Sequence, residues 1–148
     1  MSNGTAANFN PEGVPSGRGG IAQLIVEEFA DAGFGAAQQL AALANAIAES
    51  GLNPQAKAAP PEEGVGLFQI NSKVGLGAGH TVEQLTDPKI NIGLIVGAAK
   101  KFPDFAAAAS LSDAVQVFVR KIMRPANPGD EIPKRLKIAE RLAPKAGS

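Results

Sequence analysis

The stretch "IAESGLNPQA", residues 47–56, ends an alanine- and leucine-rich run and turns the chain. The run predicts a helix from Ala36 to Ser50, because its apolar residues follow helical spacing. Gly51 is a natural stop for that helix, and the Asn-Pro pair that follows it prevents continuation. Glu49 therefore stands at the end of a nearly apolar helix. It is either a solvated carboxylate or a carboxylic acid at the edge of a cleft, where partial burial makes it a proton donor.

Bulk composition narrows the class of protein. The 148 residues fit one domain with a real core, and 45% of them are hydrophobic and 19% charged. Fourteen basic and fourteen acidic residues cancel, so we expect neither nucleic acid nor an anionic membrane as a partner. No apolar run approaches the roughly 20 residues that cross a bilayer, so we expect no membrane insertion. The chain has no cysteine, which excludes disulfides and thiolate chemistry.

The first residues differ in composition from the rest. Residues 1–18 are rich in Gly, Asn, Pro and Ser, which predicts a flexible or draped N-terminal arm followed by one domain over residues 19–148. The arm has neither the basic start nor the apolar centre of a secretory signal. We therefore expect that, if the protein acts outside the cytoplasm, another agent carries or releases it there.

Hydrophobic periodicity predicts a fold that is mainly α. The helix from Lys89 to Phe102 is apolar on most sides and is expected to be central, with Ile95 buried. We also expect Ile47 to be buried in the helix from Ala36 to Ser50. "GLFQIN", residues 66–71, alternates apolar and polar residues, which predicts a short extended or β-hairpin segment. Three further helices are expected. The first covers residues 20–32, the second begins after a cap at Ser112, and the third covers residues 134–142 and follows a proline-rich turn.

Several motifs in a fixed order resemble the lysozyme-like transglycosylase family, which includes the soluble lytic transglycosylases (SLT) and the goose-type lysozymes. They are "ESGLNPQA" (49–56), "GVGLFQIN" (64–71) and "LTDPKINIGLIVGAAKKF" (85–102). The family pattern is a catalytic Glu-Ser at a helix end, an Asn-Pro loop, a Gly-Leu-x-Gln-Ile segment and an Asp-Pro-x-x-Asn-Ile helix start. "FVRKIMRPAN" (118–127) and "RLKIAERL" (135–142) are similar to the C-terminal end of phage tail lysozymes. The resemblance implies a lysozyme-like helical domain.

The resemblance also assigns roles to residues. Glu49 matches the catalytic glutamate, and glycosidic cleavage needs an acid that holds its proton near neutral pH. The end of an apolar helix supplies both desolvation and negative potential, which favour the protonated form. Asn91 is expected to hold the extended segment or Glu49 by a hydrogen bond, and Phe68 is expected to offer an apolar face to a sugar. The candidate substrate-binding residues are Ser50, Gly66, Leu67, Phe68, Gln69, Ile70 and Asn91.

Other polar residues have simpler interpretations. Glu62 and Glu63 are the nearby candidates for a second carboxylate and are otherwise solvated loop residues. Ser50 is expected to cap the helix rather than act as a nucleophile, and Asp87 to cap the helix that begins at Pro88. The sole histidine, His80, is expected to be an exposed loop residue, and one histidine makes no zinc site. We expect no metal and no cofactor.

The sequence departs from the family pattern in three ways. Such transglycosylases carry a tyrosine whose hydroxyl points at the catalytic glutamate, and this chain has no tyrosine. Met123 stands where a phage tail lysozyme has an acidic residue before Arg-Pro. Seven Phe and no Trp leave few aromatics for sugar stacking. Either another group orients Glu49, or the domain serves a structural role. Arg120 and Arg124 are candidate contacts for substrate carboxylates, or else solvated surface cations.

The motifs and the family resemblance together predict that the protein is a muramidase that cleaves peptidoglycan. The substrate is expected to be the glycan strand, cut at the MurNAc-GlcNAc β-1,4 bond by a lytic transglycosylase with a single catalytic Glu. The alternative is a catalytically weak or inactive lysozyme-fold structural component of a virion, with other virion proteins as partners. The protein is expected to be associated with a bacteriophage virion or released at lysis, and to act on the cell wall in the periplasm.

Overall fold

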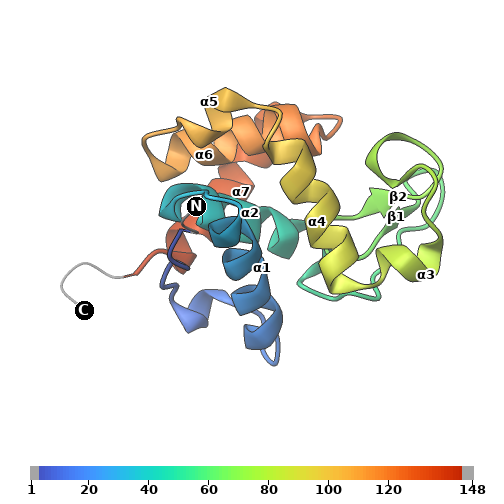
Figure 1. Ribbon diagram of the computed structural model, residues 1–148, viewed down its shortest axis with the longest axis horizontal. Helices are drawn as coiled ribbons and strands as arrows, with labels where there is room; N and C mark the ends of the chain where they lie inside the picture. Colours follow the sequence, from blue (N-terminus) through green and yellow to red (C-terminus); the bar gives the residue numbers. More distant parts are fainter. Residues whose placement is uncertain (1–3, 145–148) are drawn as a thin grey trace.

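The computed structural model describes residues 4–144, which form a helical body with a small projecting hairpin (Figure 1). The α-helices of this part of the chain are α1 (Gly19–Asp31), α2 (Ala36–Ser50), α3 (Val82–Leu85), α4 (Pro88–Ala99), α5 (Pro103–Ala106), α6 (Leu111–Val117) and α7 (Pro128–Leu142). Shorter elements are the 3-10 turns η1 (Pro11–Gly13) and η2 (Gly75–Gly77), the π-helical segment η3 (Phe118–Met123), and the strands β1 (Gly64–Val65) and β2 (Ile70–Asn71).

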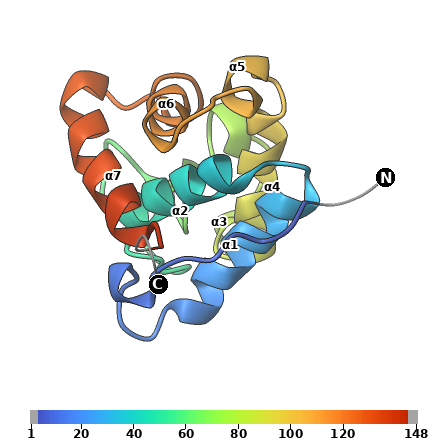
Figure 2. The ribbon, with the colours of Figure 1, turned by 90° about the vertical axis from the view of Figure 1, so that its left-hand side faces the viewer.

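Helix α2 is the centre of the body, and α1, α6 and α7 pack around it (Figure 2). Nine successive residues from Gln38 to Ala46 are buried, because the small alanine side chains let neighbouring helices approach from every side. The predicted bounds of this helix are confirmed. The expectation that α4 is central is wrong, since Gly93 and Gly97 are one turn apart and leave one face of α4 exposed.

A cluster of phenylalanines joins the helical body to the hairpin. Phe68 from the hairpin packs on Phe118 with ring centroids 6.1 Å apart, and Phe118 contacts Phe105 at 5.3 Å. Ile95 is buried as predicted, with 2% exposed. Ile47 is only partly buried, because it faces a shallow hollow between α7 and the segment that follows η1.

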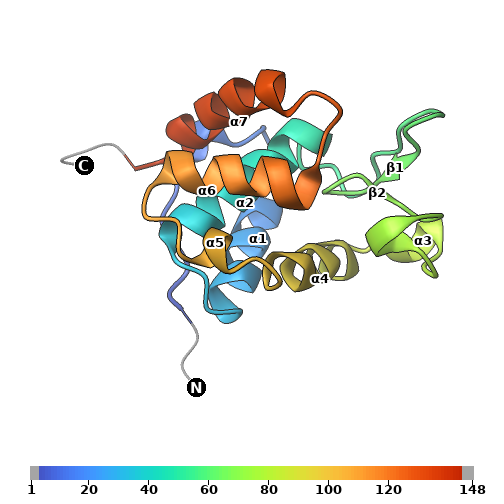
Figure 3. The same ribbon diagram turned by 90° about the horizontal axis from the view of Figure 1, so that it is seen from above.

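The β-hairpin alternative of the prediction is confirmed, but residues 66–69 form the turn of the hairpin rather than a strand. Strands β1 and β2 pair antiparallel, with Val65 opposite Ile70, and "GLFQ" forms the turn between them. Gly66 has a φ of 77°, and a β-carbon there would collide with the Leu85 carbonyl oxygen and the Asn91 amide. The turn is therefore folded tightly against the start of α4 rather than extended. Figure 3 shows the hairpin and α3 projecting together to one side of the body.

The C-terminal helices begin earlier than their predicted positions. Ser110 rather than Ser112 caps α6, and its hydroxyl accepts a hydrogen bond from the Asp113 N–H at 3.0 Å. Helix α7 begins at Pro128 rather than Lys134, because proline is well tolerated in the first turn of a helix, where its missing N–H has no partner to lose. The predicted proline-rich turn is correspondingly shorter.

The described part of the N-terminal arm lies against the helical body. The Gly4 N–H donates to the Ala30 carbonyl at 2.8 Å, and the Asn10 N–H donates to the Leu142 carbonyl at 2.7 Å. Residues 1–3 of the predicted arm lie outside the described residues. The division of the chain at residue 18 stays a prediction. Within residues 4–144, no helix combines the length and the apolar character that crossing a membrane requires.

Candidate active site

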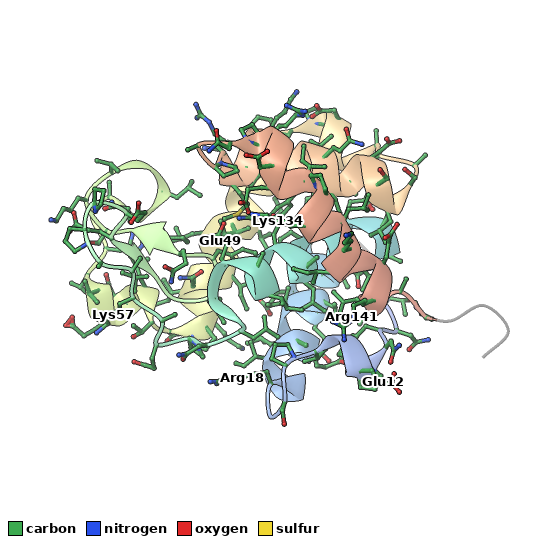
Figure 4. The ribbon with its side chains drawn as sticks, turned by 180° about the vertical axis from the view of Figure 1, so that it is seen from behind. Glu12, Arg18, Glu49, Lys57, Lys134 and Arg141 are labelled. Atoms are coloured by element: carbon green, nitrogen blue, oxygen red, sulfur yellow. The ribbon has the colours of Figure 1, made fainter. Side chains whose placement is uncertain are left out.

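Glu49 is the penultimate residue of α2, one turn after Asn45. The helix stops because Gly51 adopts a left-handed conformation with φ 61°, and its N–H donates to the Ile47 carbonyl at 2.8 Å. The Glu49 side chain retains 20% exposure. Burial raises the pKa of Glu49 above its ordinary value of 4.5, and this outweighs the opposing effect of the Arg135 guanidinium. Figure 4 places Glu49 between the hairpin and the helical body.

Arg135 of α7 binds Glu49 from the C-terminal part of the chain. Its Nη1 lies 2.8 Å from Glu49 Oε2 and donates to Asn45 Oδ1 at 2.8 Å. Its Nε and Nη2 donate to Glu131 Oε1 at 3.1 and 3.0 Å. The guanidinium is almost fully buried, so it fixes these side chains relative to one another.

Sequence reasoning missed both Arg135 and Glu131. A signal was present, because Arg135 is spaced by four and seven residues from the buried Ala139 and Leu142, and so lies on the inward face of α7. An inward-facing arginine requires an anionic partner. The neighbouring apolar residue, Leu136, is only partly buried.

A groove of about 560 Å³ runs past Glu49. One side, called here the α2–α7 wall, consists of Glu49, Glu131 and Arg135; the opposite side, called the hairpin wall, consists of Ala58, Glu62, Gly64 and Gln69. The residues between α6 and α7 complete the lining: Met123, Arg124, Pro125 and Ala126. No aromatic side chain is among these described lining residues, and the phenylalanines are used in the core instead.

Ser50 and Asn91 hold the hairpin in place. The Ser50 hydroxyl lies 2.8 Å from the Leu67 carbonyl and 3.0 Å from the Ala46 carbonyl, and it accepts a hydrogen bond from the Leu52 N–H. Asn91 Oδ1 accepts from the Phe68 N–H at 3.0 Å. Its Nδ2 donates to the carbonyls of Val65 and Leu85. The prediction that Asn91 holds the extended segment is confirmed.

The structure brings one of the predicted substrate-binding residues to the groove. Gln69 lines it, with its Nε2 bound to the Ala56 and Gly66 carbonyls at 3.1 and 3.0 Å. Phe68 does not offer an apolar face, because its side chain is fully buried against Phe118. The others are buried or turned to structural hydrogen bonds and are absent from the lining: Ser50, Gly66, Leu67, Ile70 and Asn91.

The remaining candidates divide between the groove and the surface. Glu62 lines the groove, whereas Glu63 forms an ion pair with Lys73 at 2.8 Å. Asp87 caps α4 as predicted, with Oδ1 accepting from the Lys89 N–H at 2.9 Å. His80 is partly buried rather than exposed, and its Nδ1 has no hydrogen-bond partner among the described residues.

Comparison with known proteins supports the resemblance. Residues 27–99 match the family model described as a lysozyme like domain, which spans α2, the hairpin and α4. A lysozyme-like domain indicates, at a general level, cleavage of glycosidic bonds in peptidoglycan. The search of curated proteins gave no match.

Proposed function

Because the chain belongs to a family of lysozyme-like domains, we propose that it is a muramidase that cleaves the β-1,4 bond between N-acetylmuramic acid and N-acetylglucosamine in peptidoglycan. The observation that carries this proposal is the position of Glu49. It is a largely buried carboxyl group at a helix end, its pKa is raised, and it faces a groove between two walls. This is the environment that glycosidic cleavage requires of its general acid.

Glu49 donates its proton to the bridging oxygen as the glycosidic bond breaks. Arg135 binds Oε2 at 2.8 Å, so the carboxyl group is oriented with Oε1 left to carry the proton. The guanidinium thereby performs the orienting role that a tyrosine hydroxyl has in the family that the sequence resembles. Positive charge that develops on the sugar carbon is stabilised by the Glu49 carboxylate formed in the same step.

We favour a lytic transglycosylase, in which Glu49 alone acts as acid and then as base. After the bond breaks, Glu49 removes the proton from the 6-hydroxyl of the muramoyl residue, which closes a 1,6-anhydro ring. Hydrolysis by inversion needs a second carboxylate that holds a water. Glu131 is poorly suited, since Oε1 already accepts two bonds from Arg135 and Oε2 lies 3.6 Å from Lys134 Nζ. Glu62 lines the groove but is exposed to solvent.

Mass spectrometry of muropeptides released from purified peptidoglycan tests this function. A transglycosylase gives anhydro products that are one water lighter than the reducing-end products of a hydrolase. Anhydro products support the proposal in full. Reducing-end products retain the muramidase and replace the single-glutamate route with hydrolysis, for which Glu62 is the first base to test.

The competing function is a lysozyme-fold structural component without turnover. One observation favours this structural function. Among residues 4–144, the lining of the groove contains no aromatic side chain on which a sugar could stack. A zymogram at pH values from acid to neutral separates the two functions, since a structural component clears nothing at any pH. In either case we propose association with a bacteriophage virion or release at lysis, on the basis of the C-terminal similarity to phage tail lysozymes.

A further inference from the structure

Arg124 occupies a backbone conformation that arginine rarely adopts. It follows the π-helical segment η3 with φ 52° and ψ 54°, and its N–H donates to the Val119 carbonyl at 2.8 Å. A residue with a β-carbon in this left-handed region is disfavoured, and glycine is the usual choice at such a helix end. Pro125 restricts the backbone of Arg124 further. Arginine at this position therefore suggests a use for its side chain.

The side chain belongs to the groove that contains Glu49. Arg124 lines it beside Met123 and Pro125, between the α2–α7 wall and the hairpin wall. It is exposed to solvent, and no ion pair holds it to another described residue.

The other cation of the groove, Arg135, is neither exposed nor free of ion pairs. The guanidinium of Arg135 is buried and bound to Glu49, Asn45 and Glu131, so it has little capacity for a ligand. Three carboxylates also line the groove and repel an anionic ligand: Glu49, Glu62 and Glu131. Among the lining residues, Arg124 is the cation that remains available to offset this repulsion.

We propose that Arg124 forms a subsite for a carboxylate of the substrate, which deepens and rests on the proposed muramidase function. N-acetylmuramic acid carries a lactyl ether whose carboxyl group is either free or linked to a stem peptide with carboxylates of its own. Arginine binds a carboxylate through two parallel hydrogen bonds. Arg124 thereby selects muramoyl glycans over neutral N-acetylglucosamine polymers of the same backbone.

Binding to a Glu49→Gln background tests the subsite independently of cleavage. Isothermal titration calorimetry is done with glycan strands that retain the stem peptide, with strands whose peptide was removed by an amidase, and with neutral chitooligosaccharides. Adding Arg124→Gln is expected to weaken binding of the muramoyl strands about 10- to 100-fold, the effect of losing a charged hydrogen bond. The affinity for chitooligosaccharides, if they bind, should change less than about twofold when Arg124→Gln is added. Arg124→Lys should retain part of the affinity for muramoyl strands that Arg124→Gln loses.

Arg120→Gln is the matched control. Arg120 lies within η3, four residues before Arg124, but it lines a different surface hollow with Asp104 and Asp113. Its replacement should leave binding of all three ligands unchanged. A loss confined to peptide-bearing strands assigns the subsite to a carboxylate of the stem peptide, and a loss confined to amidase-treated strands assigns it to the free lactyl carboxylate. A loss on both muramoyl strands shows that Arg124 binds either carboxylate.

Three results overturn the subsite. They are no effect of Arg124→Gln, an equal loss on chitooligosaccharides, and no binding of muramoyl strands by the Glu49→Gln protein. Failure of the muramidase function looks different, because the wild-type protein then releases no products from peptidoglycan while Arg124-dependent binding persists.

Discussion

The two walls of the groove are held by different kinds of interaction. On the α2–α7 wall, side chains as far as 90 residues apart in the sequence meet at one buried guanidinium. On the hairpin side, neutral amides and hydroxyls hold the backbone, as Asn91 and Ser50 hold the turn at Leu67 and Phe68. We interpret the α2–α7 wall as the one that carries the proposed chemistry and the hairpin wall as the one that fixes the shape of the groove. Changes in the first should alter activity, and changes in the second should alter stability.

The energetics of the two walls support this division. Burying a charged pair costs desolvation energy, so buried ion pairs are weak evidence for stability. Buried neutral groups with every hydrogen bond made do stabilise, and leaving one unpaired is costly. The Arg135 network is therefore best explained by a functional requirement, and the Asn91 network by folding.

The largest expected effect is on activity, from Glu49→Gln. Glutamine preserves shape but cannot donate a proton, and general acid catalysis typically contributes about 10²- to 10⁴-fold. We expect clearing of peptidoglycan to fall by about 10³-fold or more on that basis. Turbidity assays measure it, with circular dichroism to confirm the fold.

Matched carboxylate variants provide the control for this experiment. Glu62→Gln and Glu63→Gln are each expected to retain most activity, because Glu62 is exposed and Glu63 is paired with Lys73. If Glu62→Gln were as inactive as Glu49→Gln, the single-glutamate route would be wrong.

The next effect is on stability, from Asn91→Ala in the hairpin support. This change leaves the Phe68 N–H and the carbonyls of Val65 and Leu85 without their partner. We expect a loss of about 2–4 kcal/mol in the free energy of unfolding. Urea denaturation measures it, with Asn53→Ala as the control, since the Asn53 side chain accepts one exposed hydrogen bond from the Gln55 N–H. Equal stability of the two variants would contradict the structural role of the hairpin network.

Arg135→Gln should produce a smaller loss of rate and a shift in pH dependence. The rate at the optimum should fall about 10- to 100-fold, because Glu49 loses the charged hydrogen bond that orients it. Removing the guanidinium removes the attraction that lowers the pKa of Glu49, while the repulsion from Glu131 remains. The pKa of Glu49 should therefore rise further, and the alkaline limb of kcat/KM should move to higher pH. Movement to lower pH would show that Arg135 does not act on Glu49 in this way.

The smallest effect is expected from Lys73→Ala, at the exposed ion pair with Glu63. The Lys73 side chain is 69% exposed, so solvent screens the pair. We expect a change of less than about 1 kcal/mol in unfolding free energy and no change in activity. A larger loss would mean that surface charges also hold the hairpin wall.

The motifs predicted the scaffold better than the site. Helix α2 and its stop at Gly51 follow from local spacing and turn chemistry, and Asn91 was placed by the motif at the start of α4. Phe68 was misassigned because alternation cannot distinguish a strand from a tight turn whose residues are all buried. Arg135 was missed because its partners Glu49 and Asn45 lie far away in sequence and meet it only through the packing of α7 on α2. The spacing along α7 indicates that Arg135 faces inward, but no local pattern indicates which residues it meets there.

The titration of Glu49 decides whether this residue is the general acid. Carbon-13 NMR of its side-chain carboxyl, assigned with Glu49→Gln, gives the pKa of the free protein, and kcat/KM is measured over the same pH range. We expect the pKa of Glu49 to lie above the ordinary 4.5, because burial outweighs Arg135, and activity to be lost as Glu49 ionises over that range. A midpoint at or below 4.5, or full activity after Glu49 has ionised, would contradict the assignment of Glu49 as the general acid.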